Sequence, residues 1–468
     1  MPIALCAAPA AALLLALAAL TAEAAGTPSA LTFEDARRTF HERADIFRAD
    51  TAEVARAQHA AESAKALSGP KVDLTAMQIE GRKELNLDVD VPANLQALGN
   101  QLTGGRPLIP SRLSFSENYD LSGPRAMIAA TWPIYTGGQI TAKQNALEHE
   151  VREAAASRDA RLEEKDADLA ARYWGVQLAR SVEDLRKKAL ADEEEQVHRA
   201  KRFEAKGLIS KIERMSVEVS RDAARRELVA AGTSARVAEA ELMSALREKS
   251  LPNLATPLFI LTGDLGTLSE WQARARANSP VLARIDAQKS RAGEGVRAAE
   301  GAFHPQVFAF GTKNLIKHYL TPVEPDWMVG IGVKFTLWSN QDRFAALAAA
   351  RSVEEKAGAA RSEADNQLAT MVEVAFLRTT QAREEYDLTA STVALAAENL
   401  RLRESSFAEG LSTAIDVREA RTQLVGAQIA QRAAAYKFVV SWAMLHAAAG
   451  VMPDFSNTIG RADFKAAQ

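Results

Sequence analysis

Residues 203–219 read FEAKGLISKIERMSVEV, and residues 407–423 read FAEGLSTAIDVREARTQ. In each stretch a helical run that carries a Phe ends at a glycine, Gly207 or Gly410. Glycine is the residue that most easily adopts the positive φ of a helix C-terminus. Each stretch therefore predicts a tight turn between two antiparallel helices.

The two stretches also continue alike beyond the glycine. Ser210 and Thr413 stand where they can cap the next helix, and Glu213 and Asp416 each follow three residues later. One such copy would be an ordinary helical hairpin. Two copies 203 residues apart, each at the end of a very long helical pattern, indicate a duplicated chain.

The composition excludes some classes of function. Of 468 residues 47% are hydrophobic and 25% are charged, with a net charge of −3, so nothing favours nucleic-acid binding. Aromatic residues make up only 6%, which is typical of long solvated helices rather than of a large globular core.

The N-terminus predicts a secretory signal peptide over residues 1–24. Residues 9–22 form an apolar run too short to span a membrane, and Ala22-Glu23-Ala24 fits a small-x-small cleavage pattern. Cys6, the only cysteine, precedes this run, so we expect neither a lipid anchor nor a disulfide in the mature chain. No later segment has the uninterrupted apolar length of a transmembrane helix.

Each half opens with one predicted helix, which follows the N-cap Thr32 and runs to about Ser68 in the first half and runs from Leu268 to Phe303 in the second. After these helices each half predicts two β-strands, which follow Pro70 and Pro305. The strongest alternating pattern runs from Trp327 to Trp338, and its partner in the first half ends near Trp132. Strands of about ten residues with one apolar face, and with tryptophans near their ends, are typical of an outer-membrane sheet. The apolar set is Val72, Leu74, Ala76, Ala126, Ile128, Ala130, Trp132, Ile134, Val307, Ala309, Trp327, Val329, Ile331, Val333, Phe335 and Leu337.

These patterns divide the chain into two repeats. The first repeat covers residues 25–250, a linker covers 251–267, the second repeat covers 268–450, and the tail covers 451–468. The strand-to-strand connection is 32 residues longer in the first repeat, and we expect an extracellular loop at 81–123 with one short helix at Ala93–Leu98.

Each repeat carries a helical pattern of about 70 residues, roughly 100 Å of helix. Apolar residues recur there at sevens, which implies coiled-coil packing. We therefore predict a mainly α protein with membrane β, made of two long antiparallel helical hairpins and four strands. Four strands cannot close a barrel, but three copies would supply twelve, an even number in the known range. The spaced residues are Leu162, Leu169, Val176, Leu190, Val197, then Tyr386, Val393, Leu400, Phe407, and beside these Leu388, Leu395, Leu402.

Taken together, the chain resembles the TolC-type outer-membrane efflux channels over essentially its whole mature length. That resemblance implies a trimer with a twelve-stranded outer-membrane β-barrel and a long α-helical tunnel across the periplasm of a Gram-negative bacterium. The segments that carry it are Leu31–Ala36 with Pro70, Trp132–Gly138, Phe203–Glu213, Pro280 with Pro305, Phe335–Leu337 and Phe407–Gln423.

The resemblance also implies a gate at the inner end of the tunnel. Asp416 and Glu419 match the family's constricting acids, and Glu213 matches its acidic position in the first turn. Three copies would form rings of negative charge that attract cations. Phe407 and Ser412 replace the Tyr and Arg with which the family latches the second turn. The alternative for these carboxylates is a solvated helix N-terminus, where acids are favoured in any case.

Partners follow from the same resemblance: a homotrimer, outer-membrane lipid, a periplasmic adaptor protein, and an inner-membrane transporter of the RND, ABC or MFS type. The helical turns would form the docking tips, and Trp132, Trp327 and Trp338 the membrane-interface aromatics. The tip residues are Gly207, Leu208, Ser210, Gly410, Leu411 and Thr413.

We expect no enzyme, cofactor or metal site, because the seven histidines are scattered and no phosphate loop or nucleophile elbow appears. The predicted function is the outer-membrane channel of a tripartite efflux pump that exports drugs, toxic compounds or metal ions. One alternative is the outer-membrane duct of a type I protein secretion system. Another, of a different class, is a periplasmic coiled-coil adaptor, which should contain a lipoyl-like β domain.

Overall fold

The computed structural model describes residues 30–120, 122–318, 320, 324–409, 411–461 and 463–466. The expected signal peptide and Gly410 lie outside the described residues. The chain divides into two compact units. The helical unit comprises Met1–Val54, Ala154–Arg284 and Arg361–Gln468, and the sheet unit comprises Ala55–Glu153 and Ile285–Ala360.

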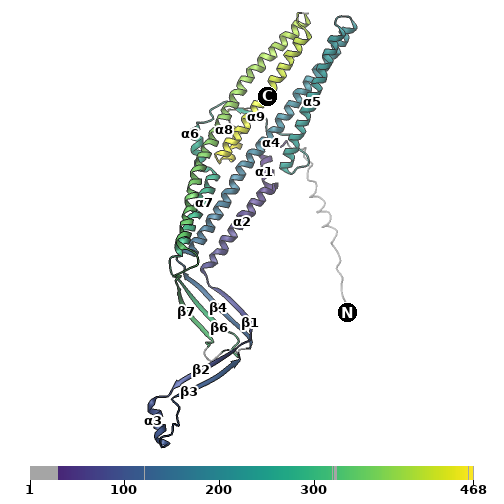
Figure 1. Cartoon of the computed structure of the whole chain (residues 1–468). Coiled ribbons are helices and arrows are strands. Elements are labelled where there is room, and N and C mark those ends of the chain that lie inside the picture. Colours follow the sequence, from purple (N-terminus) through teal and green to yellow (C-terminus); the bar gives the residue numbers. More distant parts are fainter. Residues whose placement is uncertain are drawn as a thin grey trace, which may run out of the picture. The chain divides into compact units, whose positions relative to one another are not determined.

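Helices dominate the fold (Figure 1). In chain order the α-helices are α1 Phe33–Arg43, α2 Asp45–Lys65, α3 Ala93–Leu102, α4 Gln139–Ala205, α5 Lys211–Leu246, α6 Leu268–Asn278, α7 Pro280–Gly301, α8 Arg343–Ala408, α9 Ala414–Ala448 and α10 Met452–Phe455. Two 3-10 helices, η1 Ala66–Ser68 and η2 Ser456–Gly460, complete the set. Among the described residues no helix is both long enough and apolar enough to cross a membrane.

The first helix of each half is broken where the sequence predicts a continuous one. Thr32 caps α1, as predicted, through its hydroxyl and the Asp35 N–H. Ala44 then adopts an extended conformation with ψ 122° and separates α1 from α2. In the second half Ser279 is extended with ψ 117°, as expected for a residue before proline. The two breaks lie 235 residues apart, the same offset as Pro70 and Pro305.

The sheet unit is built on one four-stranded antiparallel sheet with the order β1-β4-β6-β7. Its strands are β1 Lys71–Ile79, β4 Gly123–Tyr135, β6 Gln306–Asn314 and β7 Trp327–Lys334. The register pairs Leu74 with Ile128, Ala130 with Gly311, and Ala309 with Ile331. The predicted apolar positions of the four strands therefore lie on a single face.

β7 is shorter than the pattern from Trp327 to Trp338 predicts. It ends at Lys334, which pairs with Gln306 at the start of β6. Residue 305 is a proline, which has no N–H to donate and ends the partner strand there. Trp338 consequently lies outside the sheet, and its side chain is 92% exposed.

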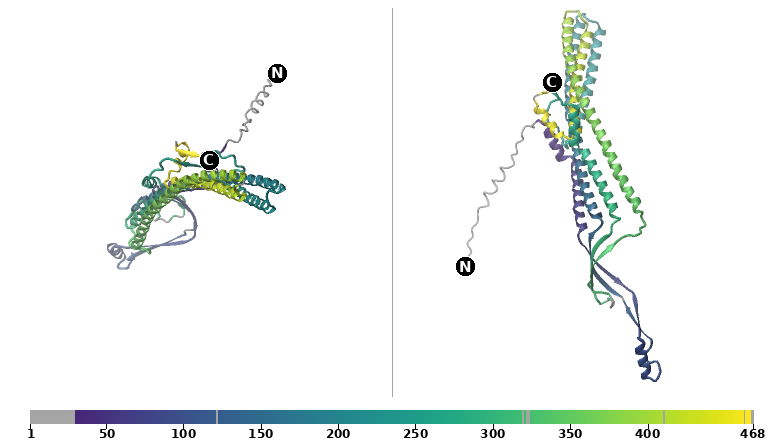
Figure 2. Two further views of the ribbon diagram at one scale, coloured as in Figure 1. Left: turned by 90° about the horizontal axis from the view of Figure 1, so that it is seen from above. Right: turned by 90° about the vertical axis from the view of Figure 1, so that its left-hand side faces the viewer.

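The predicted loop at 81–123 is instead a second β-hairpin with a helix at its end. β2 Arg82–Asp90 pairs with β3 Arg112–Asp120, and the two continue from β1 and β4 (Figure 2). The short helix predicted at Ala93–Leu98 is present and extends to Leu102 as α3. Alternation of apolar and polar residues in both strands explains the pairing, because it gives the ribbon one apolar face.

In the helical unit α4 and α5 form the first helical hairpin, and α8 and α9 form the second (Figure 1). Ion pairs join the two helices of each hairpin, for example Arg180 to Glu239 at 2.7 Å in the first and Lys437 to Glu385 at 2.9 Å in the second. Tyr436 on α9 donates its hydroxyl to the carbonyl of Ala171 on α4 at 3.3 Å, which joins the two hairpins.

An aromatic cluster forms the core of the helical unit. Trp174 lies 4.6 Å from Phe33 and 5.7 Å from Phe455 between ring centroids, and all three side chains are buried. The Trp174 indole N–H donates to the Pro257 carbonyl, which fixes the linker between the halves. This linker also contains a short strand: β5 Phe259–Leu261 pairs with β8 Phe464–Ala466 of the tail.

The predicted heptad sets differ in burial. Leu169, Val176 and Val197 of α4 are at most 5% exposed, so this stripe packs within the chain. The second set on α8 is uncovered: Leu388 and Leu395 are 71% and 70% exposed, and Leu402 is 51% exposed. A row of exposed leucines at sevens is a surface for another helix.

Candidate functional site

The first helical turn forms as predicted. Gly207 has a φ of +71°, and the Leu208 N–H donates to the Phe203 carbonyl at 2.9 Å, which closes the end of α4. Ser210 then caps α5, because its hydroxyl accepts from the Glu213 N–H at 3.2 Å while the Glu213 carboxylate accepts from the Ser210 N–H at 2.7 Å. Leu208 is 67% exposed at the tip.

These two reciprocal hydrogen bonds with Ser210 give Glu213 a structural role. Its carboxylate is exposed, and the backbone N–H of Ser210, followed by the Ser210 hydroxyl, holds the pKa of Glu213 below its usual value. The carboxylate is therefore ionised at neutral pH, as a gate acid must be. The same observation equally fits a carboxylate that only caps its helix.

The second helical turn repeats this arrangement with one addition. Thr413 caps α9, and the Asp416 carboxylate accepts from the Thr413 N–H at 2.9 Å. The Ser412 hydroxyl, which cannot form the latch of the resembled family, also donates to Asp416 at 3.1 Å. Leu411, 79% exposed, donates its N–H to the Ser406 carbonyl at 2.8 Å.

Asp416 and Glu419 differ in how they are held. The Thr413 N–H, then the Thr413 and Ser412 hydroxyls, hold the pKa of Asp416 below its usual value. Glu419 is exposed on the next turn of α9, and no hydrogen bond or ion pair to it occurs in the part of the chain that the structure describes. Asp416 is therefore committed to its own helix, and Glu419 presents a charge that the fold does not use.

Two arginines of α9, which the sequence does not single out, join the second turn to the first helical hairpin. Arg418 donates to the Ser220 hydroxyl of α5 at 3.0 Å. Arg421 binds Glu404 of α8 at 2.6 Å and approaches Asp192 of α4 at 3.9 Å, and its side chain is only 10% exposed. Burial raises the pKa of Glu193 nearby, while Arg421 and Arg418 oppose that shift. Their one sequence signal is the presence of two arginines three residues apart just beyond the cap.

Two of the three membrane-interface candidates, Trp132 and Trp327, lie on the exposed face of the sheet, whereas Trp338 lies beyond the end of β7. Trp132 is 50% exposed and donates its indole N–H to the Ser68 carbonyl at 2.8 Å, and Trp327 is 64% exposed. Between them the apolar face has no cover in the described chain, and Ile331 at its centre is 72% exposed. An apolar sheet face of this kind indicates contact with lipid or with another protein.

The opposite face of the sheet is filled by two phenylalanines. A Cβ atom added at Gly332 would lie 2.6 Å from the ring of Phe308, and one at Gly330 would lie 2.9 Å from the ring of Phe310. These glycines of β7 therefore make room for aromatic rings of β6. A large side chain at Gly332 would be excluded by crowding, whatever its polarity.

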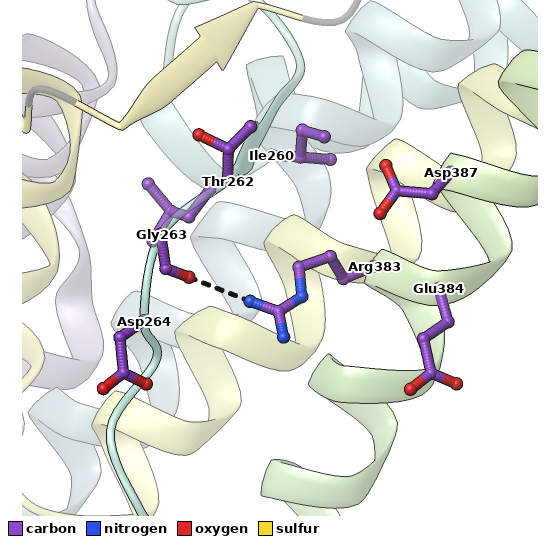
Figure 3. A pocket seen from close by; sticks show the side chains of 8 residues that line it. Ile260, Thr262, Gly263, Asp264, Arg383, Glu384 and Asp387 are labelled. Carbon is purple, nitrogen blue, oxygen red and sulfur yellow. Dashed lines mark hydrogen bonds between the residues drawn. The ribbon is translucent and has the colours of Figure 1, made fainter.

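A hollow of about 420 Å³ lies in the helical unit beside the linker (Figure 3). Asp264, Glu384 and Asp387 line it together with Arg383, whose guanidinium donates to the Gly263 carbonyl at 2.9 Å. This bond fastens the linker to α8. Within the described ranges no group of three or more His, Cys, Asp or Glu side chains is placed to hold a metal ion.

Comparison with known families identifies this architecture. A family model described as "Outer membrane efflux protein" matches residues 41–246 and 271–451. Outer membrane efflux protein BepC of Brucella suis is 28% identical over 294 residues, which are 61% of this chain and 63% of that relative. The match thus spans less than two thirds of the relative's length.

Solved structures share the fold at lower identity. The outer membrane protein VceC of Vibrio cholerae is similar with a TM-score of 0.70 and 16% identity, covering 90% of this chain and 96% of its own. The MtrE outer membrane channel of Neisseria gonorrhoeae, in its open state, has a TM-score of 0.69 and 17% identity, covering 90% of this chain and 89% of its own. The CmeC outer membrane channel of Campylobacter jejuni has a TM-score of 0.71 and 12% identity, covering 90% of this chain and 86% of its own.

Proposed function

The chain belongs to the outer membrane efflux protein family, and on that premise we propose that it is the outer-membrane channel of a tripartite efflux pump. Its family is one of channels and not of enzymes, and the chain is a protein of the outer membrane. The proposed channel is a trimeric duct that spans the periplasm and exports small molecules such as drugs, toxic compounds or metal ions.

The observation that carries the proposal is the apolar face of the sheet. Four antiparallel strands place Val72, Ile128, Ile331 and their neighbours on one face without a covering layer in the described chain. Strands of eight to thirteen residues are long enough for a tilted membrane strand. This combination supports a sheet that meets lipid.

A trimer is supported by two unpaired features of the chain. The sheet ends at β1 and β7, whose outer edges pair with no strand that the structure describes. An open edge in lipid is not viable, whereas three copies would close twelve strands into a barrel. In the helical unit the exposed stripe of Leu388, Leu395 and Leu402 would likewise face a neighbouring copy.

The gate proposal rests on the second helical turn. Three copies of Glu419, beside three of Asp416, would place a ring of carboxylates at the tunnel end. The turns themselves, with Leu208 and Leu411 exposed, would dock a periplasmic adaptor and an inner-membrane transporter of the RND, ABC or MFS type. In this role Gly207, Ser210 and Thr413 shape the tips rather than contact a partner.

Two alternatives to the efflux channel make different predictions. The duct of a type I secretion system would share this architecture and differ in cargo, so only export assays distinguish it. A periplasmic coiled-coil adaptor should contain a lipoyl-like β domain, whereas the largest sheet that the structure describes has four antiparallel strands with an exposed apolar face. That face favours the channel.

The experiment that tests the function combines assembly with transport. In detergent extracts of outer membranes we expect a heat-labile trimer, and in planar bilayers we expect cation-selective conductance. Deletion of the gene should sensitise cells to small toxic compounds without loss of a secreted protein. A monomer that fractionates with soluble periplasm would refute the proposal, and loss of a secreted protein alone would favour the type I system.

The membrane face has its own test. Ile331→Arg would place a charge in lipid at a cost of about 2–4 kcal/mol near the bilayer midplane. Met328→Arg, on the opposite face of the same strand and 45% exposed, is the matched control, because Gly332 is too crowded by Phe308 to serve. We expect trimer yield to fall for Ile331→Arg only. Equal yields would show that this face does not meet lipid.

A further inference from the structure

The β2–β3 hairpin is a regular continuation of the β1–β4 hairpin. Ile79 pairs with Gly123 at the end of one ladder, and Arg82 pairs with Asp120 at the start of the next. Each strand has two residues between the ladders, so the pairing register does not change. Alternation of side chains is therefore preserved from the membrane strands into this extension, residues 82–120.

Because the alternation is preserved, the apolar side chains lie on one face in the membrane sheet and on the other face in the extension. The apolar membrane face uses even-numbered positions such as Val72, Leu74 and Ile128, and the opposite face uses odd-numbered ones. In the extension the even positions are polar, and the odd positions Leu85, Leu87, Val89, Leu113 and Phe115 are apolar. The apolar face of the extension thus continues the side of the sheet that points away from lipid.

The polar face of the extension is complete in itself. Arg82 binds Asp120 at 3.0 Å, Arg112 binds Asp90 at 2.8 Å, and the Ser114 hydroxyl donates to Asp88 at 2.6 Å. It continues the lipid-facing side of the sheet, and a ladder of paired charges suits a surface that stands above the membrane in water. Lipid is therefore not the occupant that the extension requires.

The apolar face, in contrast, is not covered by any other part of the chain that the structure describes. Leu87 is 54% and Phe115 is 56% exposed, and an isolated two-stranded ribbon is at best marginally stable in water. At the end of the ribbon Gly99 packs against Ile109, which fixes α3, while Leu98 and Leu102 of α3 are 54% and 79% exposed. An apolar surface of this extent needs a partner on the inner side.

We propose that this partner is the same chain: three extensions pack their apolar faces together around the three-fold axis and form a lid over the outer mouth of the channel. The inference rests on the proposed trimeric channel, because only there does the inner side of the sheet face a common axis. In a symmetric trimer the same surface of each copy meets at the axis, so the occupant is another copy of this chain. In the second repeat the described residues between β6 and β7 form no second ladder.

Cysteine cross-linking tests this lid in the full-length channel. The chain offers a clean background once Cys6, its only cysteine, is replaced by Ser. Phe115→Cys and Leu98→Cys are expected to give a covalent trimer with a trifunctional maleimide on intact cells. Ser116→Cys, one position along β3 on the polar face, is the matched control and should give monomer that a large impermeant maleimide labels readily.

A second measurement guards against misfolded variants. Replacing residues 82–120 by a short turn should leave the heat-labile trimer intact and raise its resting conductance. Absence of a covalent trimer at both apolar positions, in channels that remain heat-labile trimers, would refute the lid and leave the proposed function standing. Loss of the trimer in the unsubstituted chain would refute both. Quenching of a dye at Phe115→Cys by spin-labelled lipid would assign the face to the membrane and refute the lid.

Discussion

At the first helical turn Arg214 binds Glu204 at 2.7 Å and Glu218 at 2.6 Å, both within its own hairpin. At the second turn Arg421 binds Glu404 of its own hairpin at 2.6 Å and also approaches Asp192 of the other hairpin at 3.9 Å. The caps of the two turns are nearly identical, yet the arginine of the first turn stays within its hairpin and that of the second also reaches across. The comparison teaches that a repeated turn sequence determines backbone geometry, while side chains one turn further determine which contacts a turn makes with the other hairpin.

The largest effect should come from removing Arg421, which bonds within its hairpin and also reaches the other. Arg421→Ala discards a nearly buried guanidinium and its charge-assisted bond to Glu404, and should lower the free energy of unfolding by about 2 kcal/mol. It should also raise the resting conductance, because the second turn loses one of its two contacts with the first hairpin. Arg214→Ala is the control: its bonds lie within one hairpin, so we expect a smaller loss of stability and an unchanged conductance. Thermal unfolding and single-channel recording would measure both, and equal conductance changes would abolish the distinction between the turns.

A half-buried carboxyl group, that of Glu163, contrasts with the acids of the turns. Glu163 on α4 accepts the N–H of Met452 at 2.9 Å, yet burial raises its pKa to about 7. Asp166 and Asp159 add to this rise, and Arg37 opposes it. The folded state therefore holds a proton that the unfolded chain releases near its ordinary pKa of 4.5. This contribution to stability is full below the unfolded value and is lost as pH rises through about 7.

Glu163→Gln keeps an acceptor for Met452 and removes the charge. We expect the variant to match the parent at pH 4 and to be more stable at pH 8. One pKa unit corresponds to about 1.4 kcal/mol, and after discounting for solvent screening the gain should be about 1–2 kcal/mol. The midpoint of thermal unfolding across this pH range is the measurement. A gain that does not depend on pH would mean that packing, and not titration, separates the two proteins.

The two capping acids provide the next comparison. Glu213→Ala and Asp416→Ala each remove one side of a capping box, and each should lower the midpoint of thermal unfolding slightly. Their stability losses should be alike because the caps are alike. Cation selectivity in planar bilayers should fall only for Asp416→Ala if the second turn forms the gate. A matching fall for Glu213→Ala would place both turns at the constriction.

The smallest change in stability is expected at Glu419. Because its exposed carboxylate has no partner in the described chain, Glu419→Gln should alter the free energy of unfolding by less than about 0.5 kcal/mol. Selectivity for cations and block by multivalent cations should nevertheless decrease. This variant separates the gate from the cap, which Asp416→Ala cannot do. Unchanged selectivity would assign Glu419 to solvent or to a neighbouring helix.

Local chemistry was the part of this fold that the sequence could predict. Thr32, Ser210 and Thr413 each cap a helix as predicted, because a cap depends on residues within one turn. The glycine at 207 and the alternating strands follow from equally short-range rules. The break at Ala44 was missed because nothing in the residue itself disfavours a helix, in contrast to Ser279 before Pro280.

Features that depend on distant partners were not predictable. β5 and β8 have three residues each, which is too short for an alternating sequence pattern to show, and each is a strand only because it pairs with the other. The reach of Arg421 to Asp192 spans more than two hundred positions. In the insertion, the Gly and Pro residues near α3 favour a loop. The alternation of Leu85, Leu87 and Val89 indicates a strand only once Leu113 and Phe115 are seen to pair with it.

The pairing of β5 with β8 has a consequence for the order in which the molecule can fold. Phe259 of β5 is fully buried and lies 4.9 Å from Phe464 of β8, so part of the central core is contributed by residues 464–466, about two hundred positions further along the chain. Until they arrive, the linker strand has an open edge and the aromatic cluster lacks one wall. Contacts so distant in sequence form slowly. The linker between the halves is therefore fixed late in folding, after the helical hairpins on either side of it, whose contacts are nearer in sequence.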